Sequence, residues 1–191
     1  MTWEDIMKEE IVSKERIESR INELADQIVE DYSKVMDKGE EIMLVCILKG
    51  SYIFTADLSR AISARGVSTV IDFMCVSSYG SGTESSGEVR VLLDLRKPMR
   101  GKHVLVVEDI CESARTLAFL QHTFRSRSPK SLKTVTLLDK PYKRISHDVS
   151  LDYVGFTIPD HFVVGYGLDY DEKFRSLPNV IVLRPSVYSR L

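Results

Sequence analysis

VLVVEDICESARTL, residues 104–117, predicts a buried β-strand that runs directly into a helix. Four consecutive aliphatic residues are typical of a strand covered on both faces, as in a parallel sheet. Two adjacent acids, Glu108 and Asp109, follow them, and a third acid, Glu112, stands three residues further on. The stretch therefore predicts an α/β unit that gathers three carboxylates at the end of its strand.

The rest of the chain alternates strands and helices in the same way. Ser13 can cap a helix that runs to about Met36, and the apolar run IMLVCIL (42–48) predicts a second buried strand, followed by an amphipathic helix through about Ala64. Further strands are predicted from STVIDFMCVSSY, EVRVLLDL, KTVTLLDK, LDYVGFTI, HFVVGYGL and NVIVL, and a helix from SARTLAFLQHTF. This order predicts an α/β fold with a mostly parallel central sheet covered on both faces, in which ligands bind beyond the carboxyl ends of the strands.

Bulk composition limits the class of protein. With 191 residues, of which 43% are hydrophobic and 28% are charged, the chain is long enough for one well-cored domain, residues 1–191, and short for two. The formal net charge of -2 disfavours binding to nucleic acid or to an anionic membrane.

Cysteine usage and the N-terminus predict a soluble intracellular protein. Cys46, Cys75 and Cys111 are odd in number and lack metal-ligand spacing, which is typical of packing residues in a reduced compartment. Cys111 stands close to a predicted helix N-terminus, a position that can lower the pKa of a thiol. No run of 18 apolar residues is present, and the acidic N-terminus MTWEDIMKEE is unlike a signal or transit peptide.

Two segments are candidate phosphate sites. GSGTESSG (80–87) contains Gly-x-Gly, but a strand follows it and no Gly-Lys-Ser/Thr is present, so it fits neither dinucleotide-binding nor ATP-type loops. Its glycines predict a mobile loop. The 109–116 segment is a better candidate, because a helix whose first turn is Ser113-Ala114-Arg115-Thr116 offers free backbone N–H groups, a favourable dipole and two hydroxyls to an anion.

The three acids allow a structural and a functional interpretation. For an isolated Asp109 or Ser113, capping of the following helix is the more common role. Adjacent Glu108 and Asp109 repel each other, which is offset if they bind ribose hydroxyls or a divalent cation. Three acids together are harder to assign to capping than one, so both interpretations stay open at this point.

These residues resemble a known family. VLVVEDICESART is similar to the phosphoribosyl pyrophosphate motif of type I phosphoribosyltransferases, in which two acids and two apolar residues usually precede Asp-Thr-Gly-x-Thr. Glu112, Ser113 and Ala114 depart from the usual Asp, Thr and Gly. Other blocks resemble the hypoxanthine-guanine branch in the same order, and the match spans roughly residues 40 to 185: LKGSYIF (48–54), SSYGSGTESSG (77–87), LLDKPYKR (137–144) and FVVGYGLDYDEKFRSL (162–177).

The resemblance implies a fold and a reaction. The fold would be the type I phosphoribosyltransferase fold, with a small hood formed by the N- and C-terminal segments. A 6-oxopurine, hypoxanthine or guanine, would displace pyrophosphate from C1 of phosphoribosyl pyrophosphate, giving IMP or GMP in purine salvage, with Mg²⁺ as cofactor. A xanthine-preferring enzyme and a non-catalytic regulatory or nucleotide-binding protein of the same fold are the alternatives. A homodimer or homotetramer is implied.

The resemblance also assigns roles to individual residues. The 5'-phosphate would bind residues 112–116, that is Glu112, Ser113, Ala114, Arg115 and Thr116. Glu108 and Asp109 would hold the ribose hydroxyls or magnesium, with Asp169 as a further magnesium ligand. Glu112 would be the catalytic acid near purine N7. The longer stem of Glu112 changes its reach, and Ala114 limits positive φ in the loop.

The pyrophosphate and base sites are implied in the same way. Lys49 and Gly50, after a cis peptide at Leu48, would bind pyrophosphate together with Arg175; the alternative for Lys49 and Arg175 is solvated surface charge. Lys140 would donate to purine O6 and so reject a 6-amino group. Phe162 would stack on the base, and the backbone of Val163 and Asp169 would contact its other edge; core packing is the alternative for Phe162 and Val163. The loop with Ser78 and Tyr79 would close over the site as a lid.

The last three residues, Ser189-Arg190-Leu191, resemble the Ser-Lys-Leu peroxisomal address. They predict import into a peroxisome-like organelle such as the glycosome, with a cytoplasmic location as the alternative.

Overall fold

A computed structural model gives the positions of residues 6–78, 89–146 and 148–188. The predicted loop 80–87, the lid residue Tyr79, the side chain of Ser78 and the C-terminal tripeptide lie outside the described residues, so the roles predicted for them stay predictions. Within the described residues, no helix has the length and apolarity needed to cross a membrane.

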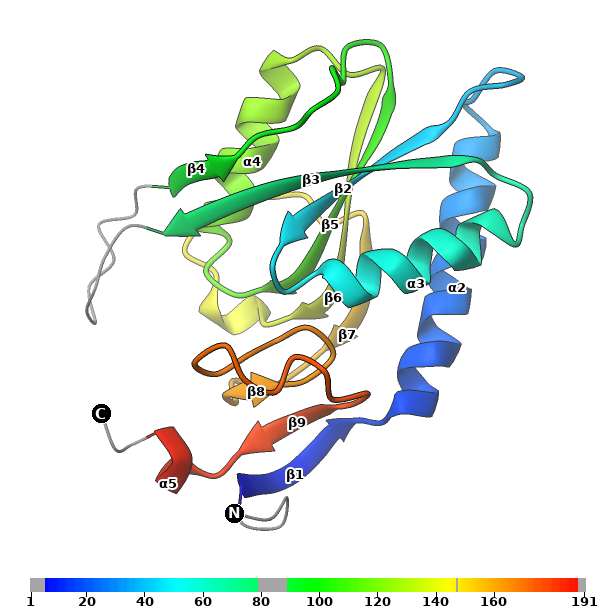
Figure 1. Ribbon diagram of the computed structural model, residues 1–191. Helices are drawn as coiled ribbons and strands as arrows, with labels where there is room; N and C mark the ends of the chain where they lie inside the picture. The colour runs from blue at the N-terminus through cyan, green and yellow to red at the C-terminus, as the bar shows by residue number, and fades with distance from the viewer. Residues whose placement is uncertain (1–5, 79–88, 147, 189–191) are drawn as a thin grey trace.

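Six strands form the central sheet, in the order β4-β3-β2-β5-β6-β7 (Figure 1). Neighbouring strands from β3 to β7 run parallel, and the edge strand β4 runs antiparallel to β3. The aliphatic runs of β2 and β5 are almost fully buried, as expected for strands covered on both faces. The predicted mostly parallel sheet is confirmed. Its strands are β2 Ile42–Leu48, β3 Thr69–Ser78, β4 Val89–Leu93, β5 His103–Cys111, β6 Ser131–Asp139 and β7 Tyr153–Thr157.

Helices cover the two faces of this sheet. Helices α2 (Lys14–Ser33) and α3 (Tyr52–Ser63) lie on one face, and α4 (Arg115–Ser126) lies on the other (Figure 1). Ser13 caps α2 as predicted, because its hydroxyl accepts a hydrogen bond from the backbone N–H of Arg16 at 3.3 Å. Each face has its own buried cluster: Leu24, Ile28, Phe54 and Leu58 belong to the first, and Leu117, Leu120 and Phe124 to the second.

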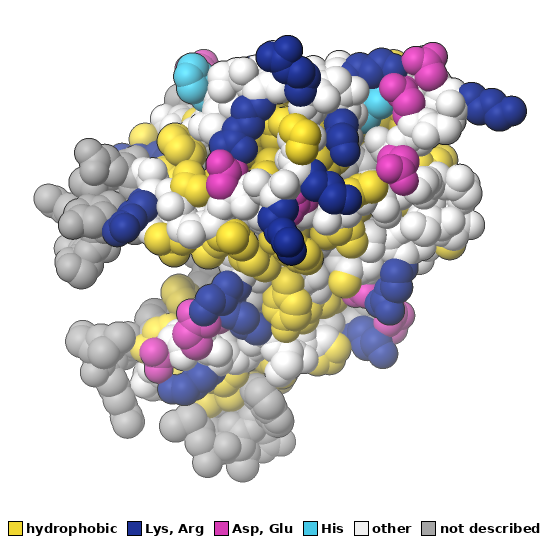
Figure 2. Space-filling view, turned by 45° about the horizontal axis from the view of Figure 1, so that its top comes forward, with side chains coloured by type: hydrophobic (Ala, Val, Ile, Leu, Met, Phe, Trp, Pro, Cys, Tyr) yellow, Lys and Arg dark blue, Asp and Glu magenta, His cyan; other side chains and the backbone are white. Residues whose placement is uncertain are grey.

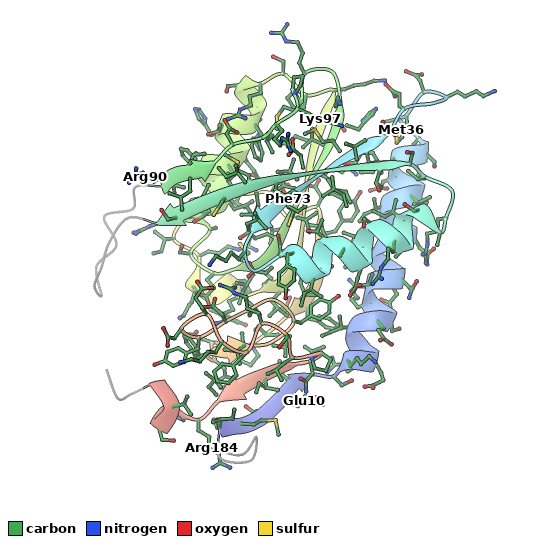
Figure 3. All side chains as sticks on the ribbon, in the orientation of Figure 1. Glu10, Met36, Phe73, Arg90, Lys97 and Arg184 are labelled. Carbon is green, nitrogen blue, oxygen red and sulfur yellow. The ribbon has the colours of Figure 1, made fainter. Side chains whose placement is uncertain are left out.

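A second, three-stranded antiparallel sheet forms the predicted hood. Its order is β1 (Met7–Val12), β9 (Val180–Leu183) and β8 (Val163–Val164), so the two ends of the chain pair with each other. Figure 3 shows Glu10 on β1 and Arg184 just after β9 in this lower part of the molecule. Two short helices, the 3₁₀ turn Pro141–Lys143 and α5 (Pro185–Tyr188), complete the described elements.

We predicted that both faces of the sheet are covered, but part of one face is exposed at the β3–β4 edge. Ile71 and Phe73 on β3 are 39% and 43% exposed, and Leu93 on β4 is 45% exposed. Phe73 is labelled on β3 in Figure 3. The reason is geometric: α3 packs mainly over β2, so the described helices leave these side chains at the β3–β4 edge open. Elsewhere, Figure 2 shows basic and acidic side chains interspersed with hydrophobic ones on one face, in line with the low net charge.

Parallel strands place their carboxyl ends at one edge of the sheet. Here β2 ends at Leu48, β5 at Cys111 and β6 at Asp139, and each is followed by residues of a predicted site. The hood lies below this edge in Figure 1. The fold therefore gathers the segments after β2, β5 and β6 opposite the hood.

Candidate active site

The two adjacent acids lie near the carboxyl end of β5, which extends through Cys111 and so is longer than its aliphatic run. Both side chains are half-buried. The Oδ1 atom of Asp109 accepts a hydrogen bond from the backbone N–H of Ile110 at 2.8 Å. A Cβ atom built on Gly50 would collide with the carboxylate of Asp109, so the segment after β2 lies directly against this acid and a larger residue at position 50 would displace its side chain.

Burial sets the electrostatics of this pair. Burial raises the pKa of Glu108 well above its usual range, and the neighbouring Asp109 carboxylate raises it further. Burial raises the pKa of Asp109 as well, although its backbone hydrogen bonds and Arg175 act in the opposite direction. The Oε2 atom of Glu108 is buried and has no hydrogen-bond partner within the described residues. The pair is therefore destabilised until a hydroxyl donor or a cation approaches.

The loop after β5 differs from the predicted helix start. Helix α4 begins at Arg115, and Ala114 precedes it in the left-handed region with φ 61°. Ser113 and Ala114 are thus not helical, and alanine adopts the positive φ that it was expected to limit. The cause lies in the backbone hydrogen bonds of the loop: the carbonyl of Ser113 accepts from the N–H groups of Ile145 and Ser146 at 3.0 and 3.2 Å.

The capping alternative is not supported by these contacts. Helix α4 has no side-chain cap, and the Ser113 hydroxyl accepts from Arg115 N only at 3.5 Å. Asp109 bonds to Ile110 instead. The thiol of Cys111 also departs from the expectation for a helix N-terminus, because burial raises its pKa to about 11.

A cavity of about 190 Å³ lies over this loop. Among its lining residues are Glu108, Glu112, Ser113, Ala114 and Thr116. Five of the predicted phosphate and ribose residues are thereby brought together, whereas Asp109 and Arg115 do not line the cavity. Asp109 instead faces Gly50.

A second cavity of about 370 Å³ shares Ile110 and Glu112 with the first. It contains all four predicted purine-site residues, Lys140, Phe162, Val163 and Asp169. Phe162 is 41% exposed and packs edge-to-face on Tyr170, with ring centroids 5.8 Å apart, so core packing does not describe its side chain. Val163 is 6% exposed and belongs to the core as well as to the cavity wall.

Lys140 is the most enclosed charged residue of this cavity. Its residue exposure is 3%, and its ammonium group donates to the Glu112 carboxylate and, at 2.7 Å, to the carbonyl of His161. Among the wall residues that sequence reasoning missed are a base and an acid, Lys143 and Asp160, which pair at 2.9 Å. Lys143 lies inside the 137–144 block and Asp160 two residues before 162–177, so proximity to these blocks is the available signal.

The predicted pyrophosphate residues also come together. The Leu48–Lys49 peptide is cis, as the resemblance implied. A Cβ atom on Gly167, which has φ +103°, would collide with the carbonyl of Gly50, so the hood loop and the segment after β2 touch here. Arg175 donates to the carbonyl of Gly167 at 2.8 Å and pairs with Asp169 at 2.9 Å. Lys49 and Arg175 thus face a shared region rather than separate parts of the surface.

Metal ligands are not preassembled in the described part of the chain. No group of three or more His, Cys, Asp or Glu side chains there is arranged to hold an ion. Asp169, predicted as a further magnesium ligand, has both carboxylate oxygens engaged, one with Arg175 and one with the backbone N–H of Glu172 at 2.9 Å.

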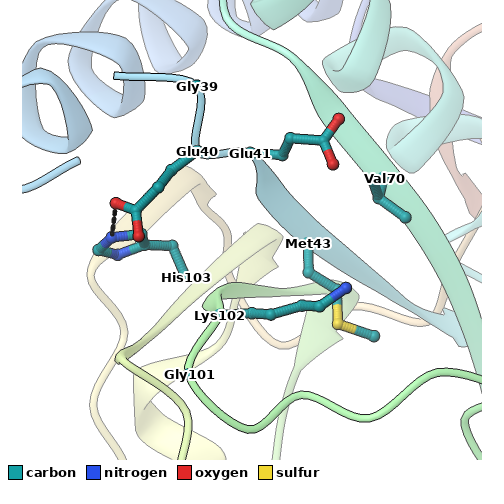
Figure 4. A pocket seen from close by; sticks show the side chains of 8 residues that line it. All are labelled: Gly39, Glu40, Glu41, Met43, Val70, Gly101, Lys102 and His103. Atoms are coloured by element: carbon teal, nitrogen blue, oxygen red, sulfur yellow. Dashed lines mark hydrogen bonds and ion pairs between the residues drawn. The ribbon is translucent and has the colours of Figure 1, made fainter. Parts of the chain in front are cut away.

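Another cavity lies at the opposite, amino-terminal ends of the strands (Figure 4). Its polar walls include Glu40, Glu41, Lys102 and His103. The Glu40 carboxylate is already bound, by His103 at 3.1 Å and by Lys130 at 2.7 Å. None of the predicted site residues lines this cavity. Because the Glu40 carboxylate already has its partners, these contacts indicate a structural role.

Comparison with known proteins agrees with this geometry. A family model described as a phosphoribosyl transferase domain matches residues 7–171. The chain belongs to the phosphoribosyltransferase family. Its relatives in this family include the hypoxanthine-guanine phosphoribosyltransferase of Leishmania donovani, which is 45% identical over 94% of this chain and 85% of that protein. The enzyme of the same name from Mycobacterium tuberculosis strain H37Rv is 46% identical over 95% and 89%.

Solved structures of the family give the same fold. A hypoxanthine phosphoribosyltransferase from Trypanosoma cruzi, studied for the role of its C-terminal region in oligomeric state and activity, superposes with a TM-score of 0.91 at 47% identity and covers 97% of this chain and 95% of that one. The same enzyme in complex with the product IMP gives 0.89 at 46% identity, with coverage of 98% and 100%. The family resemblance and the fold class predicted from the sequence are confirmed.

Proposed function

We propose that the protein transfers the phosphoribosyl group of 5-phosphoribosyl 1-pyrophosphate to hypoxanthine or guanine, forming IMP or GMP and pyrophosphate in purine salvage. One observation carries this proposal: a cavity over the loop 112–116 and a cavity around Lys140 and Phe162 meet at Glu112. A nucleoside monophosphate needs this pair of sites, one for its phosphate and ribose and one for its base. The curated relatives named hypoxanthine-guanine phosphoribosyltransferases support the same reaction.

The reaction forms a bond between a purine ring nitrogen and C1 of the sugar while the bond from C1 to pyrophosphate breaks. Glu108 and Asp109 place negative charge near the sugar, where positive charge develops in the transition state. The nitrogen that attacks loses its proton overall, and Glu112, at the junction of the two cavities, is the carboxylate placed to help move it.

Selectivity for a 6-oxopurine is assigned to Lys140. An ammonium group has three donors and no acceptor, so it can bond to a carbonyl oxygen but not to an amino group. Its contacts with Glu112 and the His161 carbonyl hold the ammonium group at the cavity wall, where a 6-amino group would oppose its N–H donors. Phe162, exposed at the cavity wall, offers its ring to the base.

We propose magnesium as the cofactor. Glu108 and Asp109 supply carboxylate oxygens, the ligand type that magnesium prefers, and the buried Oε2 atom of Glu108 has no protein donor within the described residues. Magnesium usually keeps several waters and adds substrate oxygens, so one or two carboxylates suffice. When bound, the ion would neutralise charge on the pyrophosphate group.

We also propose a homodimer or homotetramer. The exposed apolar residues Ile71, Phe73 and Leu93 on the open β3–β4 edge support this assembly. Sedimentation at micromolar concentration should show a mass of two or four chains, and the double variant Ile71→Ser/Phe73→Ser should give a smaller species. A wild-type monomer would reject the assembly.

Equilibrium binding of IMP tests the proposed function without relying on turnover. Calorimetry should detect binding of IMP and GMP, and much weaker binding of AMP, whose base carries a 6-amino group. Lys140→Ala should weaken IMP binding and narrow its preference over AMP. Equal affinity for IMP and AMP in the wild-type protein would contradict the assigned purine site.

A further inference from the structure

Glu172 holds the two cations that the proposed function assigns to pyrophosphate. A single carboxylate oxygen, Oε2, accepts from the ammonium group of Lys49 at 3.0 Å and from the guanidinium of Arg175 at 3.3 Å. Lys49 follows β2 in the central sheet, whereas Arg175 belongs to the hood loop. The carboxylate thus bridges two distant segments at the point where an anionic ligand is expected.

The local backbone fixes where this carboxylate stands. Tyr170 and Lys173 pair through two backbone hydrogen bonds, of 3.2 and 3.0 Å, so Asp171 and Glu172 form a two-residue turn. Both turn residues have positive φ, 52° and 60°, a conformation that favours Asn and Gly. A second restraint is the hydrogen bond from the Glu172 backbone N–H to Asp169. The backbone conformation of this turn does not favour glutamate. The contacts of the Glu172 side chain are therefore the feature that needs an explanation.

The two cations differ in how firmly they are held. The Arg175 side chain is 17% exposed and also bonds to the Gly167 carbonyl and to Asp169. By contrast, Lys49 and Glu172 are 59% and 64% exposed. An ion pair between side chains this exposed contributes little to stability. An anion of higher charge can therefore displace the Glu172 carboxylate at a small cost in free energy.

We propose that Glu172 acts as an internal competitor of pyrophosphate: its carboxylate occupies Lys49 and Arg175 in the free enzyme and must leave when a pyrophosphate group binds. The consequence is a lower affinity for pyrophosphate, which helps to release this product after transfer. Binding exchanges one carboxylate for an anion of higher charge, and no covalent step is involved. The inference rests on the proposed function, because that function assigns the two cations to pyrophosphate.

Calorimetric titration of pyrophosphate with magnesium tests the competition. Glu172→Gln keeps the size and turn of the residue but removes its charge, and we expect pyrophosphate to bind about two- to five-fold more tightly. Asp171→Asn is the matched control: it removes the same charge from the adjacent turn position, where Asp171 pairs with Lys173 at 2.8 Å and touches neither Lys49 nor Arg175. The control should change pyrophosphate affinity by less than half as much.

The outcomes separate this inference from the proposed function. Equal affinity in Glu172→Gln and wild type, weaker affinity in the variant, or an equal gain in Asp171→Asn would each overturn the competition. IMP binding to the same samples reports on the base and 5'-phosphate sites. If wild type binds IMP and pyrophosphate while Glu172→Gln shows no gain, only this inference fails; if wild type binds neither, the proposed function fails.

Discussion

The ammonium group of Lys140 donates a hydrogen bond to the carboxylate of Glu112, at the junction of the two cavities of the proposed active site. The Lys140 side chain is 4% exposed and the Glu112 side chain 42%, so the cation is enclosed while its partner reaches solvent. The ion pair links the residue assigned to purine O6 with the acid assigned to N7. A base that enters the cavity would therefore meet a lysine that is already oriented.

Replacement of Lys140 by alanine should reduce kcat/KM for hypoxanthine. Loss of one charge-assisted hydrogen bond costs about 2–3 kcal/mol of transition-state stabilisation, a reduction of roughly 30- to 150-fold. Steady-state kinetics checks the value. An unchanged kcat/KM would place Lys140 outside the base site.

Glu112→Gln should lower kcat more than it weakens phosphoribosyl pyrophosphate binding, because the neutral amide cannot take part in proton movement near N7 and leaves the enclosed Lys140 without its nearest countercharge. Glu112→Asp restores a carboxylate of the family's usual length and should retain or raise activity. Comparison of the two variants separates the effect of the carboxylate charge from the effect of the side-chain length. Full turnover by Glu112→Gln would refute the assigned role.

Glu108→Gln should stabilise the free protein while it impairs catalysis. An acid whose folded pKa is raised binds more protons in the folded state, so its ionisation makes the folded state less stable as pH rises above the unfolded value. Removing this charge should therefore raise the free energy of unfolding at pH 7.5. Thermal melting checks the sign, and a lower Tm would show that the carboxylate serves packing instead.

The same ionisation predicts the pH dependence of activity. Because burial raises the pKa of Glu108 and Asp109, wild-type kcat/KM should fall as pH drops from neutral toward 5, at a higher pH than exposed carboxylates would require. Substrate with magnesium should raise the Tm of wild type and leave that of Glu108→Gln nearly unchanged.

Glu40→Gln, at the opposite end of the sheet, should lower Tm and leave kcat unaffected. Hydrogen bonds from Lys130, from the Asp37 backbone and from His103 hold the pKa of Glu40 at about 2. An acid with a lowered folded pKa stabilises the fold above its unfolded pKa, and this contribution is lost as pH falls from about 4.5 toward 2. The Tm difference from wild type should therefore be full at pH 7 and shrink below about pH 4.5. Glu41→Gln is the control: the Glu41 carboxylate accepts a hydrogen bond from the Ser68 hydroxyl at 2.7 Å, the amide oxygen of glutamine can still accept it, and the drop in Tm should be smaller.

Most of the central fold could be predicted because the buried strands carry a clear pattern. IMLVCIL and HVLVVE are apolar throughout, and Ser13 marks the start of a helix with a regular apolar face. Strand β1 was missed as an element, since MKEEIV has one buried residue and pairs only at the hood edge. The positive φ of Ala114 could not be predicted from the sequence either. Hydrogen bonds from the backbone N–H groups of residues 145 and 146 to the preceding carbonyl override the local preference of alanine.

The types and order of residues in the sequence predict which residues form the candidate site. The contacts between their side chains cannot be predicted in this way. The acids, lysines and glycines stand in recognisable blocks, so the sequence alone predicts the sites after β2, β5 and β6. Pairs such as Lys140 with Glu112 and Lys49 with Glu172 join residues from separate loops. Side-chain partners across such distances depend on how the loops pack, which local sequence does not encode.

The most direct test of the proposed function is a spectrophotometric assay with phosphoribosyl pyrophosphate, magnesium and one of four bases: hypoxanthine, guanine, xanthine or adenine. Purified protein should form IMP from hypoxanthine and GMP from guanine, and should leave adenine unreacted. Preference for xanthine would reassign the substrate within the same reaction. No nucleotide from any base, or turnover of adenine in place of hypoxanthine and guanine, would contradict the account.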